Sequence, residues 1–345
     1  MPNSYHVIKY KDRPIIALPA VSNRRLIKTA IHRYQPETPK RAMLHYCLKG
    51  TVGLGLDVFL PRVSNSRLQN ILKFNLDGWL EQISRSLGTD SIKPMLVWPP
   101  EAGRGRIYVH LLRHDGSILA FAKVSLTEDS NKHLLTETET LRLLAKLGHR
   151  KYRAPAVLTE GTFNGRRYLI AEAIPAHARP FRANHESFPL EAVREYAGPI
   201  KFSTGEEIQN RSWWQQFCAA ADSHIAFYKE ARNAMKEAKI KICRVHGDMG
   251  PSNMIRSDNE LWIVDWEQSC PDGPYLTDVV SFYLGSNRRR VLKNTYWELQ
   301  NLFEMLVTSP HRGTRADILM ALAFLHGAGF KLATMIIDVW ENTIC

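Results

Sequence analysis

The sequence predicts an α+β protein in which a strand-rich part of the chain is followed by a helical part. From about Met95 to Ala171 the residues favour strands joined by short turns, and past Pro175 apolar residues recur at helical spacing. Strands that are segregated from helices along a chain are typical of this class. The 345 residues, of which 44% are hydrophobic and 23% charged, suffice for two or three domains with substantial cores.

The first 90 residues contain no recognisable motif. Residues 15–18 and 52–60 are expected to form short strands, whereas residues 75–87 have the apolar spacing of a helix. We expect residues 1–90 to be an N-terminal extension that packs on or near the strand-rich part.

This extension carries much of the net charge of +12. Ten Lys or Arg residues stand among residues 1–50, against only Asp12 and Glu37. A basic excess favours a negatively charged partner such as anionic lipid, a phosphorylated glycan or nucleic acid. A solvated basic face is the commoner reason for such a cluster. Peripheral contact with an anionic membrane surface is therefore one hypothesis.

Several classes of protein are disfavoured by what the sequence lacks. No apolar run reaches the roughly 18 residues of a membrane-spanning helix, and the N-terminus lacks the apolar core of a signal peptide. The five cysteines are scattered without Cys-x-x-Cys spacing, which indicates neither a disulfide framework nor a zinc site. We expect a cytoplasmic protein, with any membrane contact at the inner membrane surface.

A first hairpin is predicted from strands over residues 107–112 and 118–126, because Asp115-Gly116 between them favours a tight turn. Its second strand carries Lys123 within an apolar run. A lysine in a strand is usually a surface residue. A helix over residues 136–147 should follow, with the acids Glu137 and Glu139.

Gly103 and Gly105 precede this hairpin, with arginines beside them. Glycines let backbone N–H groups approach phosphates closely, although most Gly-x-Gly pairs are only turns. No Walker A motif occurs, which disfavours a P-loop architecture. A second hairpin is predicted around Asn164-Gly165, the strongest short hairpin signal.

The most informative stretch contains His246-Gly247-Asp248, then Asn253, then an apolar strand over residues 261–264 that ends at Asp265. Taken singly, each acid is more often a turn or cap residue than a catalytic group. Together they supply two carboxylates and an amide, which a phosphoryl-transfer site needs to deprotonate a hydroxyl and to hold Mg²⁺.

These residues resemble a known family. His246-Gly247-Asp248, Asn253 and Asp265-Trp266-Glu267 resemble the catalytic and metal loops of the aminoglycoside phosphotransferase and choline kinase superfamily, which has the protein-kinase-like fold. Protein kinases have His-Arg-Asp, an Asn five residues after the Asp, and then Asp-Phe-Gly. This chain has Trp-Glu after Asp265 and no Ala-Pro-Glu motif beyond it, which points to a small-molecule kinase.

The resemblance implies a bilobal α+β fold. Residues 91–174 would form a small N-lobe with an antiparallel sheet, and residues 175–345 a mostly helical C-lobe, after the extension of residues 1–90. Lys123 would contact the nucleotide phosphates and pair with Glu137, chosen over Glu139 by its register with Leu144.

Further roles follow from the same resemblance. Gly103 and Gly105 would cover the phosphates, and backbone groups of Glu172 and Ile174 in the hinge segment would bind the purine. In the C-lobe, Asp248 would accept or orient the proton of the acceptor, and His246 would brace the loop. Asn253 and Asp265 would hold Mg²⁺. ATP and Mg²⁺ are thus the expected cofactors.

The expected function is transfer of the γ-phosphoryl group of ATP to an alcohol hydroxyl. The tail beyond Gly285 is mildly basic, which favours a neutral or anionic acceptor such as a sugar, a glycan or a lipid head group. Aminoglycoside or choline and ethanolamine acceptors stay open. Two other classes also stay open: a catalytically inactive kinase-like binding module, and a basic nucleic-acid-binding protein, for which no recognition motif is present.

Overall fold

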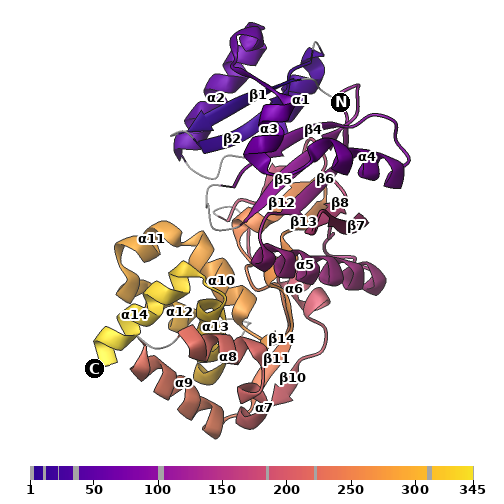
Figure 1. Cartoon of the computed structure of the whole chain (residues 1–345). Coiled ribbons are helices and arrows are strands. Elements are labelled where there is room, and N and C mark those ends of the chain that lie inside the picture. Colours follow the sequence, from indigo (N-terminus) through magenta and orange to yellow (C-terminus); the bar gives the residue numbers. More distant parts are fainter. Residues whose placement is uncertain are drawn as a thin grey trace. The chain divides into compact units, whose positions relative to one another are not determined.

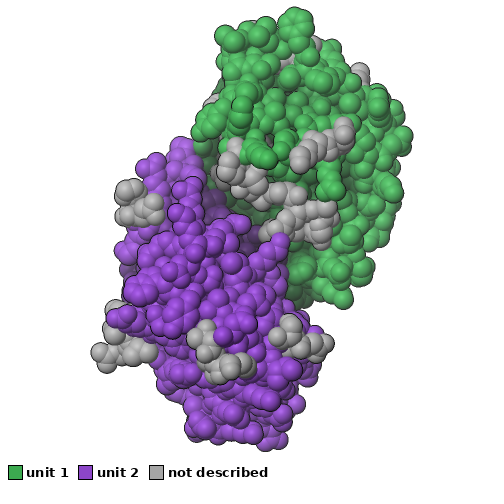
Figure 2. Space-filling view, turned by 90° about the vertical axis from the view of Figure 1, so that its left-hand side faces the viewer, with its two compact units in different colours: residues 1–142, 155–176 green, residues 143–154, 177–345 purple. Residues whose placement is uncertain are grey.

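The chain forms two compact units, described from a computed structural model (Figure 1). Unit 1 contains Met1–Arg142 and Pro155–Ala176, and unit 2 contains Leu143–Ala154 and His177–Cys345 (Figure 2). The structure describes residues 4–10, 13–21, 23–33, 39–99, 105–183, 186–220, 224–308 and 313–344.

The predicted α+β class is confirmed, because unit 1 is built on an antiparallel sheet and unit 2 is mostly helical. The three-part division of the chain stays a prediction. Residues on both sides of its first boundary, at residue 90, belong to unit 1.

Unit 1 contains an eight-stranded sheet with the order β3-β1-β2-β4-β5-β6-β8-β7, in which all neighbours are antiparallel. Both predicted hairpins, β5 to β6 and β7 to β8, are confirmed. Asn164 and Gly165 both have positive φ, 49° and 75°, as a tight hairpin turn requires. The strands are β1 Ser4–Tyr10, β2 Arg13–Pro19, β3 Arg62–Ser64, β4 Lys93–Val97, β5 Arg106–Leu112, β6 Ile118–Ser125, β7 Val157–Phe163 and β8 Arg166–Ala171.

The N-terminal residues extend this sheet, since β2 pairs with β4 and β1 lies between β2 and β3. The strand expected over residues 15–18 is confirmed as part of β2. The strand expected over residues 52–60 is wrong, because this stretch holds the end of one helix and a 3-10 turn. Leu54 is 79% exposed, so the alternating apolar residues there do not line one buried face. The helices of unit 1 are α1 Arg24–Arg33, α2 Pro39–Gly53, η1 Leu56–Phe59, α3 Asn65–Leu72, α4 Leu76–Ser86 and α5 Glu128–Leu147.

Helices cover both faces of the sheet because strand residues alternate between the two faces. On one face, Trp79 of α4 packs in a cluster with Val109 of β5 and Ala122 of β6. On the other face, Ile27 of α1 packs in a second cluster with Ile16 of β2. The predicted helix over residues 75–87 is confirmed as α4, whose N-cap side chain at Asn75 accepts a hydrogen bond from the backbone of Gly78.

Unit 2 is built around α13, whose residues from Ala316 to His326 are all buried. A helix that is apolar on all sides belongs in a core. The helices are α6 Leu190–Ala197, α7 Gly205–Gln209, α8 Ser212–Ala220, α9 Ile225–Glu237, η4 Pro251–Asn253, η5 Trp266–Gln268, α10 Thr277–Ser286, α11 Arg288–Lys293, α12 Thr295–Thr308, α13 Arg315–Gly327 and α14 Lys331–Ile344. The strands are β9 Arg179–Pro180, β10 Lys201–Ser203, β11 Ile240–Val245, β12 Met254–Ser257, β13 Glu260–Ile263 and β14 Cys270–Pro274.

Two three-stranded sheets in unit 2 position the functional loops. One has the order β10-β11-β14 and the other the order β13-β12-β9. The predicted strand over residues 261–264 is confirmed, with a shift of one residue, as β13.

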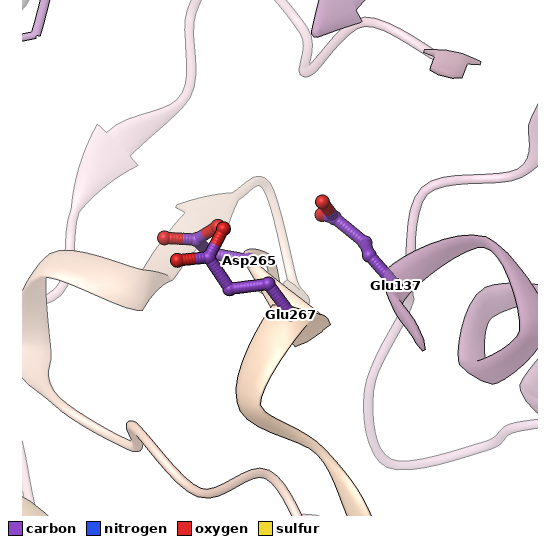
Figure 3. A group of neighbouring side chains, drawn as sticks. All are labelled: Glu137, Asp265 and Glu267. Atoms are coloured by element: carbon purple, nitrogen blue, oxygen red, sulfur yellow. The ribbon is translucent and has the colours of Figure 1, made fainter. Parts of the chain in front are cut away.

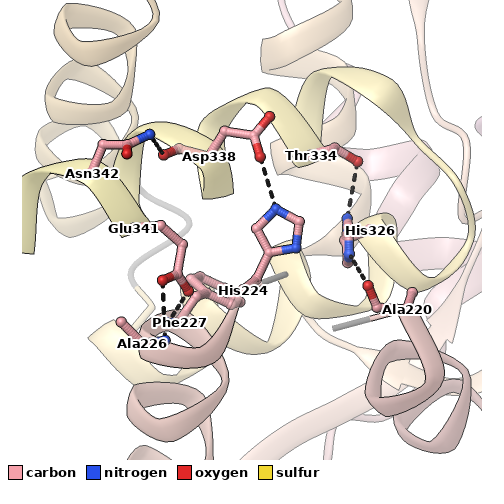
Figure 4. A network of polar contacts seen from close by, with 9 residues as sticks. All are labelled: Ala220, His224, Ala226, Phe227, His326, Thr334, Asp338, Glu341 and Asn342. Atoms are coloured by element: carbon pink, nitrogen blue, oxygen red, sulfur yellow. Dashed lines mark hydrogen bonds and ion pairs between the residues drawn. The ribbon is translucent and has the colours of Figure 1, made fainter. Parts of the chain in front are cut away.

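Side chains of α14 close the N-terminus of α9 (Figure 4). The Glu341 carboxylate accepts hydrogen bonds from the backbone of Ala226 and of Phe227, at 3.1 and 2.7 Å, and Asp338 lies 2.8 Å from His224 Nε2. These contacts satisfy N–H groups that a helix start leaves without partners. None of the helices in the described ranges is long and apolar enough to cross a membrane.

Candidate active site

Unit 1 contains a buried ion pair between Lys123 and Glu137. Lys123 lies on β6 and Glu137 on α5, and the Nζ atom lies 2.8 and 2.7 Å from the two carboxylate oxygens. The two residues are only 7% and 4% exposed, whereas Glu139 is exposed to solvent. Of the two acids that the sequence offered, Glu137 is therefore the partner. A two-point contact to a carboxylate fixes the ammonium group in place.

The glycines proposed to cover phosphates are only partly described. Gly103 lies outside the described residues. Gly105 has a φ of 53°, and a Cβ there would lie 2.1 Å from Thr127 Oγ1. Its carbonyl also accepts a hydrogen bond from Leu126 N. Only glycine fits this position just before β5.

The hinge residues are half-buried at the end of unit 1. The Glu172 N–H donates to the Ala156 carbonyl at 2.8 Å. A purine contact by Glu172 would therefore have to use its carbonyl oxygen. Ile174 follows two residues later, outside any strand.

Unit 2 contains His246 and Asp248 in the loop that follows β11, and Asn253 at the end of η4. His246 is fully buried, and its Nε2 lies 2.9 Å from the Val264 carbonyl. Its Nδ1 accepts the backbone N–H of Asp248 at 3.3 Å. A carbonyl only accepts and an N–H only donates, so these partners select the neutral ring with its proton on Nε2. The buried His246 ring thus links the Asp248 backbone to the Val264 carbonyl, and its side chain does not reach solvent.

Asp278 fastens the start of the same loop from α10. Its carboxylate accepts the N–H groups of His246 and Gly247 at 2.8 and 3.0 Å, and the Tyr196 hydroxyl at 2.7 Å. Asp278 is 1% exposed, and burial together with this carboxylate raises the pKa of Tyr196 well above its usual value. The loop backbone is thus held by a buried negative charge with three donors.

The Asn253 amide orients Asp248. Its Nδ2 donates to the Asp248 carbonyl at 2.7 Å and lies 3.2 Å from the carboxylate oxygen Oδ2. The Asn253 carbonyl also accepts the Val264 N–H at 3.0 Å, which ties the loop to the end of β13. Because Nδ2 faces Asp248, Oδ1 is the Asn253 atom that could bind a cation.

Asp265 follows β13 and lies beside Glu267 (Figure 3). Carboxylate oxygens of the two residues lie within 4.8 Å of each other. Asp265 has a φ of 69°, a left-handed conformation that is uncommon outside glycine and often marks functional sites. The third labelled side chain in Figure 3, Glu137, belongs to unit 1 and is the partner of Lys123.

The residue between these two acids anchors the turn. Trp266 is fully buried, and its indole N–H donates to the Ile263 carbonyl at 3.0 Å. Its ring lies against His246 and Tyr196, with ring centres 4.6 and 5.1 Å away. The turn that presents Asp265 and Glu267 is therefore packed on the residues that hold the Asp248 loop.

The acidic pair has the donor set that a hard divalent cation needs. Mg²⁺ prefers carboxylate and amide oxygens and keeps several waters, so two carboxylates and the Asn253 Oδ1 fit it. Glu267 was part of the sequence motif but received no role there. Its place two residues after Asp265 was the available signal. Tyr196 carried no signal, because its contact with Asp278 joins residues 82 positions apart.

Comparisons with known proteins find similar structures but no matching sequence. No protein-family model matches the chain, and no curated protein matches it either. The structure is similar to a putative fructosamine-3-kinase from Haemophilus somnus, with 16% identity, 74% of this chain and 96% of that chain covered, and a TM-score of 0.43.

Two further similar structures are also described as phosphotransferases. A GDP complex of aminoglycoside 2'-phosphotransferase-IIIa shares 11% identity, with 78% of this chain and 99% of that chain covered and a TM-score of 0.47. An ethanolamine kinase from Plasmodium vivax shares 11% identity, with 79% and 86% covered and a TM-score of 0.42. At these identities and TM-scores, the chemistry of the site has to be inferred from the residues of this chain.

Proposed function

We propose that this protein is an ATP-dependent kinase that transfers the γ-phosphoryl group to an alcohol of a small molecule. The observation that carries the proposal is the contact of Asn253 with Asp248, together with the pair of carboxylates, Asp265 and Glu267, in the turn that follows β13. A carboxylate for the acceptor proton and oxygen ligands for a divalent cation are the parts that phosphoryl transfer uses.

Asp248 is the group that receives the acceptor proton. The acceptor hydroxyl oxygen forms a bond to the γ-phosphorus while the bond from that phosphorus to the bridging oxygen of ADP breaks. The hydroxyl proton passes to the Asp248 carboxylate, and ADP leaves. The contact from Asn253 Nδ2 to the Asp248 side chain keeps the carboxylate in one orientation, which is how positioning lowers the barrier.

A magnesium ion would be held by Asp265, Glu267 and the Asn253 Oδ1. When bound with the nucleotide it supplies positive charge that offsets the charge of the phosphate oxygens. The left-handed backbone at Asp265 and the buried Trp266 keep the two carboxylates close together.

In unit 1, Lys123 would contact the nucleotide phosphates and Glu137 would hold Lys123 in place. The distances of 2.8 and 2.7 Å support this assignment, because such a lysine needs a fixed ammonium group. Gly105, together with Gly103, would lie against the phosphates. Backbone groups of Glu172 and Ile174 would bind the purine.

We assign the acceptor to sugars or lipid head groups that are neutral or anionic. Arg288 and Arg289 on α11 are exposed, whereas Arg290 is engaged by Glu298 at 2.9 Å. A basic surface of this kind disfavours strongly cationic acceptors. The similar structures are described as kinases of fructosamine and ethanolamine and as a phosphotransferase of aminoglycosides, so these compounds belong in an acceptor screen.

The test is transfer of labelled phosphate from γ-labelled ATP to a fractionated extract and to a panel of sugars, lipid head groups, choline, ethanolamine and aminoglycosides. The wild-type protein should label one acceptor class in the presence of Mg²⁺ and none in EDTA. Asp265→Asn combined with Glu267→Gln should abolish labelling and keep the wild-type melting temperature. Asp258→Asn, which removes an exposed carboxylate from the β12–β13 turn, is the matched control and should retain activity.

Three outcomes would contradict parts of this proposal. Near-normal labelling by the double variant would contradict the proposed metal site. ATP binding without phosphate transfer to any fraction would support a catalytically inactive binding module. Salt-dependent binding to DNA or RNA without phosphate transfer would support a nucleic-acid-binding protein.

A further inference from the structure

The outward side of α2 and η1 in unit 1 is apolar and exposed. Five large apolar side chains there are between 44% and 80% exposed: Met43, Tyr46, Leu54, Leu56 and Phe59. We call these five residues the α2 patch. Single exposed apolar residues are ordinary on protein surfaces, but five within 17 residues of one helix and the turn after it are not.

Helix geometry places much of this patch on one side. With 3.6 residues per turn, Met43, Tyr46, Gly50 and Leu54 fall on one face, and Leu48 and Val52 fall on the opposite face. The latter two residues are buried against α1 and the sheet. A Cβ added at Gly50 would meet no atom within 4 Å, so this side of the helix is open. The helix thus has one apolar face that packs in unit 1 and a second that does not.

The chain around the patch is basic. Residues 1–59 include ten lysines or arginines against three acids, Asp12, Glu37 and Asp57; the basic residues are Lys9, Lys11, Arg13, Arg24, Arg25, Lys28, Arg33, Lys40, Arg41 and Lys49. Of these, Lys28 on α1 and Lys40 on α2 are exposed. α1 packs beside α2 in the same hydrophobic cluster. The stretch of residues 43–59 that carries the patch holds one basic residue, Lys49, and one acid, Asp57, and it is set within an N-terminal region of net positive charge.

This combination selects one kind of partner. A second copy of the same face would bring two basic surfaces together, which like charges oppose. Nucleic acid binds through cations along its phosphates, and the centre of this patch has none. An anionic lipid surface matches both features, because its headgroups attract the surrounding cations and its interface accepts apolar side chains.

We propose that the α2 patch docks the protein on an anionic membrane surface, with Leu54, Leu56 and Phe59 entering the headgroup boundary. The proposal concerns unit 1 alone and does not depend on the kinase reaction. Anionic lipid headgroups would bind the basic N-terminal residues. Apolar insertion and electrostatic attraction together can hold a protein on a membrane to which either one alone would bind only weakly.

Sedimentation of the full chain with vesicles tests this proposal. The protein should bind vesicles that contain phosphatidylglycerol and not vesicles of phosphatidylcholine alone, and high salt should release it. Leu54→Ser combined with Phe59→Ser should weaken binding at least about tenfold. Leu292→Ser combined with Trp297→Ser, which changes two residues of unit 2 with 55% and 54% exposure, is the matched control and should bind as the wild type does.

The charges can be tested separately. Lys28→Gln combined with Lys40→Gln should weaken binding roughly 30-fold. Lys229→Gln combined with Lys236→Gln, two exposed lysines of α9, should have no such effect. Equal binding to neutral and anionic vesicles, an equal loss in the control variants, or dimerisation through the patch in place of lipid binding would overturn the proposal. Activity on a water-soluble acceptor should be unchanged in all four variants, which separates this test from that of the kinase.

Discussion

Unit 2 contains two bends that each carry an aspartate next to a strand and that differ in how they are held. Asp248 lies between β11 and η4, and Asp258 lies between β12 and β13. The bend of Asp248 is fastened by the buried carboxylate of Asp278 and by the buried ring of His246. Asp258 is exposed, and its side-chain partner is His177, which is also largely exposed.

Within the described ranges, the two bends differ in that only the Asp248 bend is held by a buried charged group, Asp278. Burying a charge such as Asp278 is costly unless its lone pairs are satisfied, and three donors satisfy them. A simple turn needs no such support, because its own residues form it. The network around Asp278 therefore indicates that the Asp248 bend does more than reverse the chain: it holds the Asp248 loop in a fixed geometry.

Removing Asp278 should give the largest effect. Asp278→Ala leaves the Tyr196 hydroxyl and two backbone N–H groups buried without their acceptor, and each costs roughly 1 to 3 kcal/mol, so the free energy of unfolding should fall by about 4 kcal/mol. Tyr196→Phe removes one donor and should cost about 1 kcal/mol. Urea denaturation measures both changes. Equal unfolding midpoints for Asp278→Ala and the wild type would contradict the claim that the buried Asp278 carboxylate stabilises the Asp248 bend.

Two glycines with similar backbones sharpen the comparison. Gly247 has a φ of 85°, and a Cβ there would lie 2.2 Å from the Gln268 carbonyl oxygen. Gly165, in the β7–β8 turn, has a φ of 75° and nothing within 4 Å of such an atom. Gly247→Ala should therefore cost about 3 kcal/mol, and Gly165→Ala about 1 kcal/mol from the left-handed backbone alone. Thermal melts of the two variants measure this difference in stability. Equal losses of stability would mean that the backbone at the Asp248 bend is no more tightly packed than that of a hairpin turn.

A pH effect beside the second bend should be the smallest. Partial burial raises the pKa of Glu186, but hydrogen bonds from Arg179 and Arg256 outweigh it and lower the pKa to about 2. Because the folded-state pKa lies below the unfolded value, the stabilisation is complete above about pH 5 and is lost as the pH falls toward 2. Glu186→Gln should flatten this part of the acid dependence of unfolding. An unchanged slope would show that the β9–β12 edge is not held by this charge.

The parts of the fold that the sequence predicted depend on short-range signals. Asn164-Gly165 fixes a hairpin through its own backbone preferences, and the spacing of apolar residues in α4 defines a buried face within about three turns. The pairing of Lys123 with Glu137, 14 residues apart, was an implication of the family resemblance, and the two side chains are in contact in the structure.

Other features depend on contacts that no local pattern reveals. Residues 52–60 alternate as a strand would, yet Val52 is buried on α2 in a cluster with α1, and Leu54 and Leu56 of the same alternation are exposed. The joining of β2 to β4 and the support that Asp278 gives to the Asp248 loop link residues about 80 and 30 positions apart.

The most direct test of the central claim compares Asp248→Asn with Asp258→Asn in phosphoryl transfer from labelled ATP with Mg²⁺. Both substitutions keep the shape of the side chain and remove one negative charge. We expect Asp248→Asn to lower turnover by at least about a hundredfold at an unchanged melting temperature, because it removes the proton acceptor, and Asp258→Asn to retain the wild-type rate. Equal turnover in the two variants would contradict the assignment of Asp248.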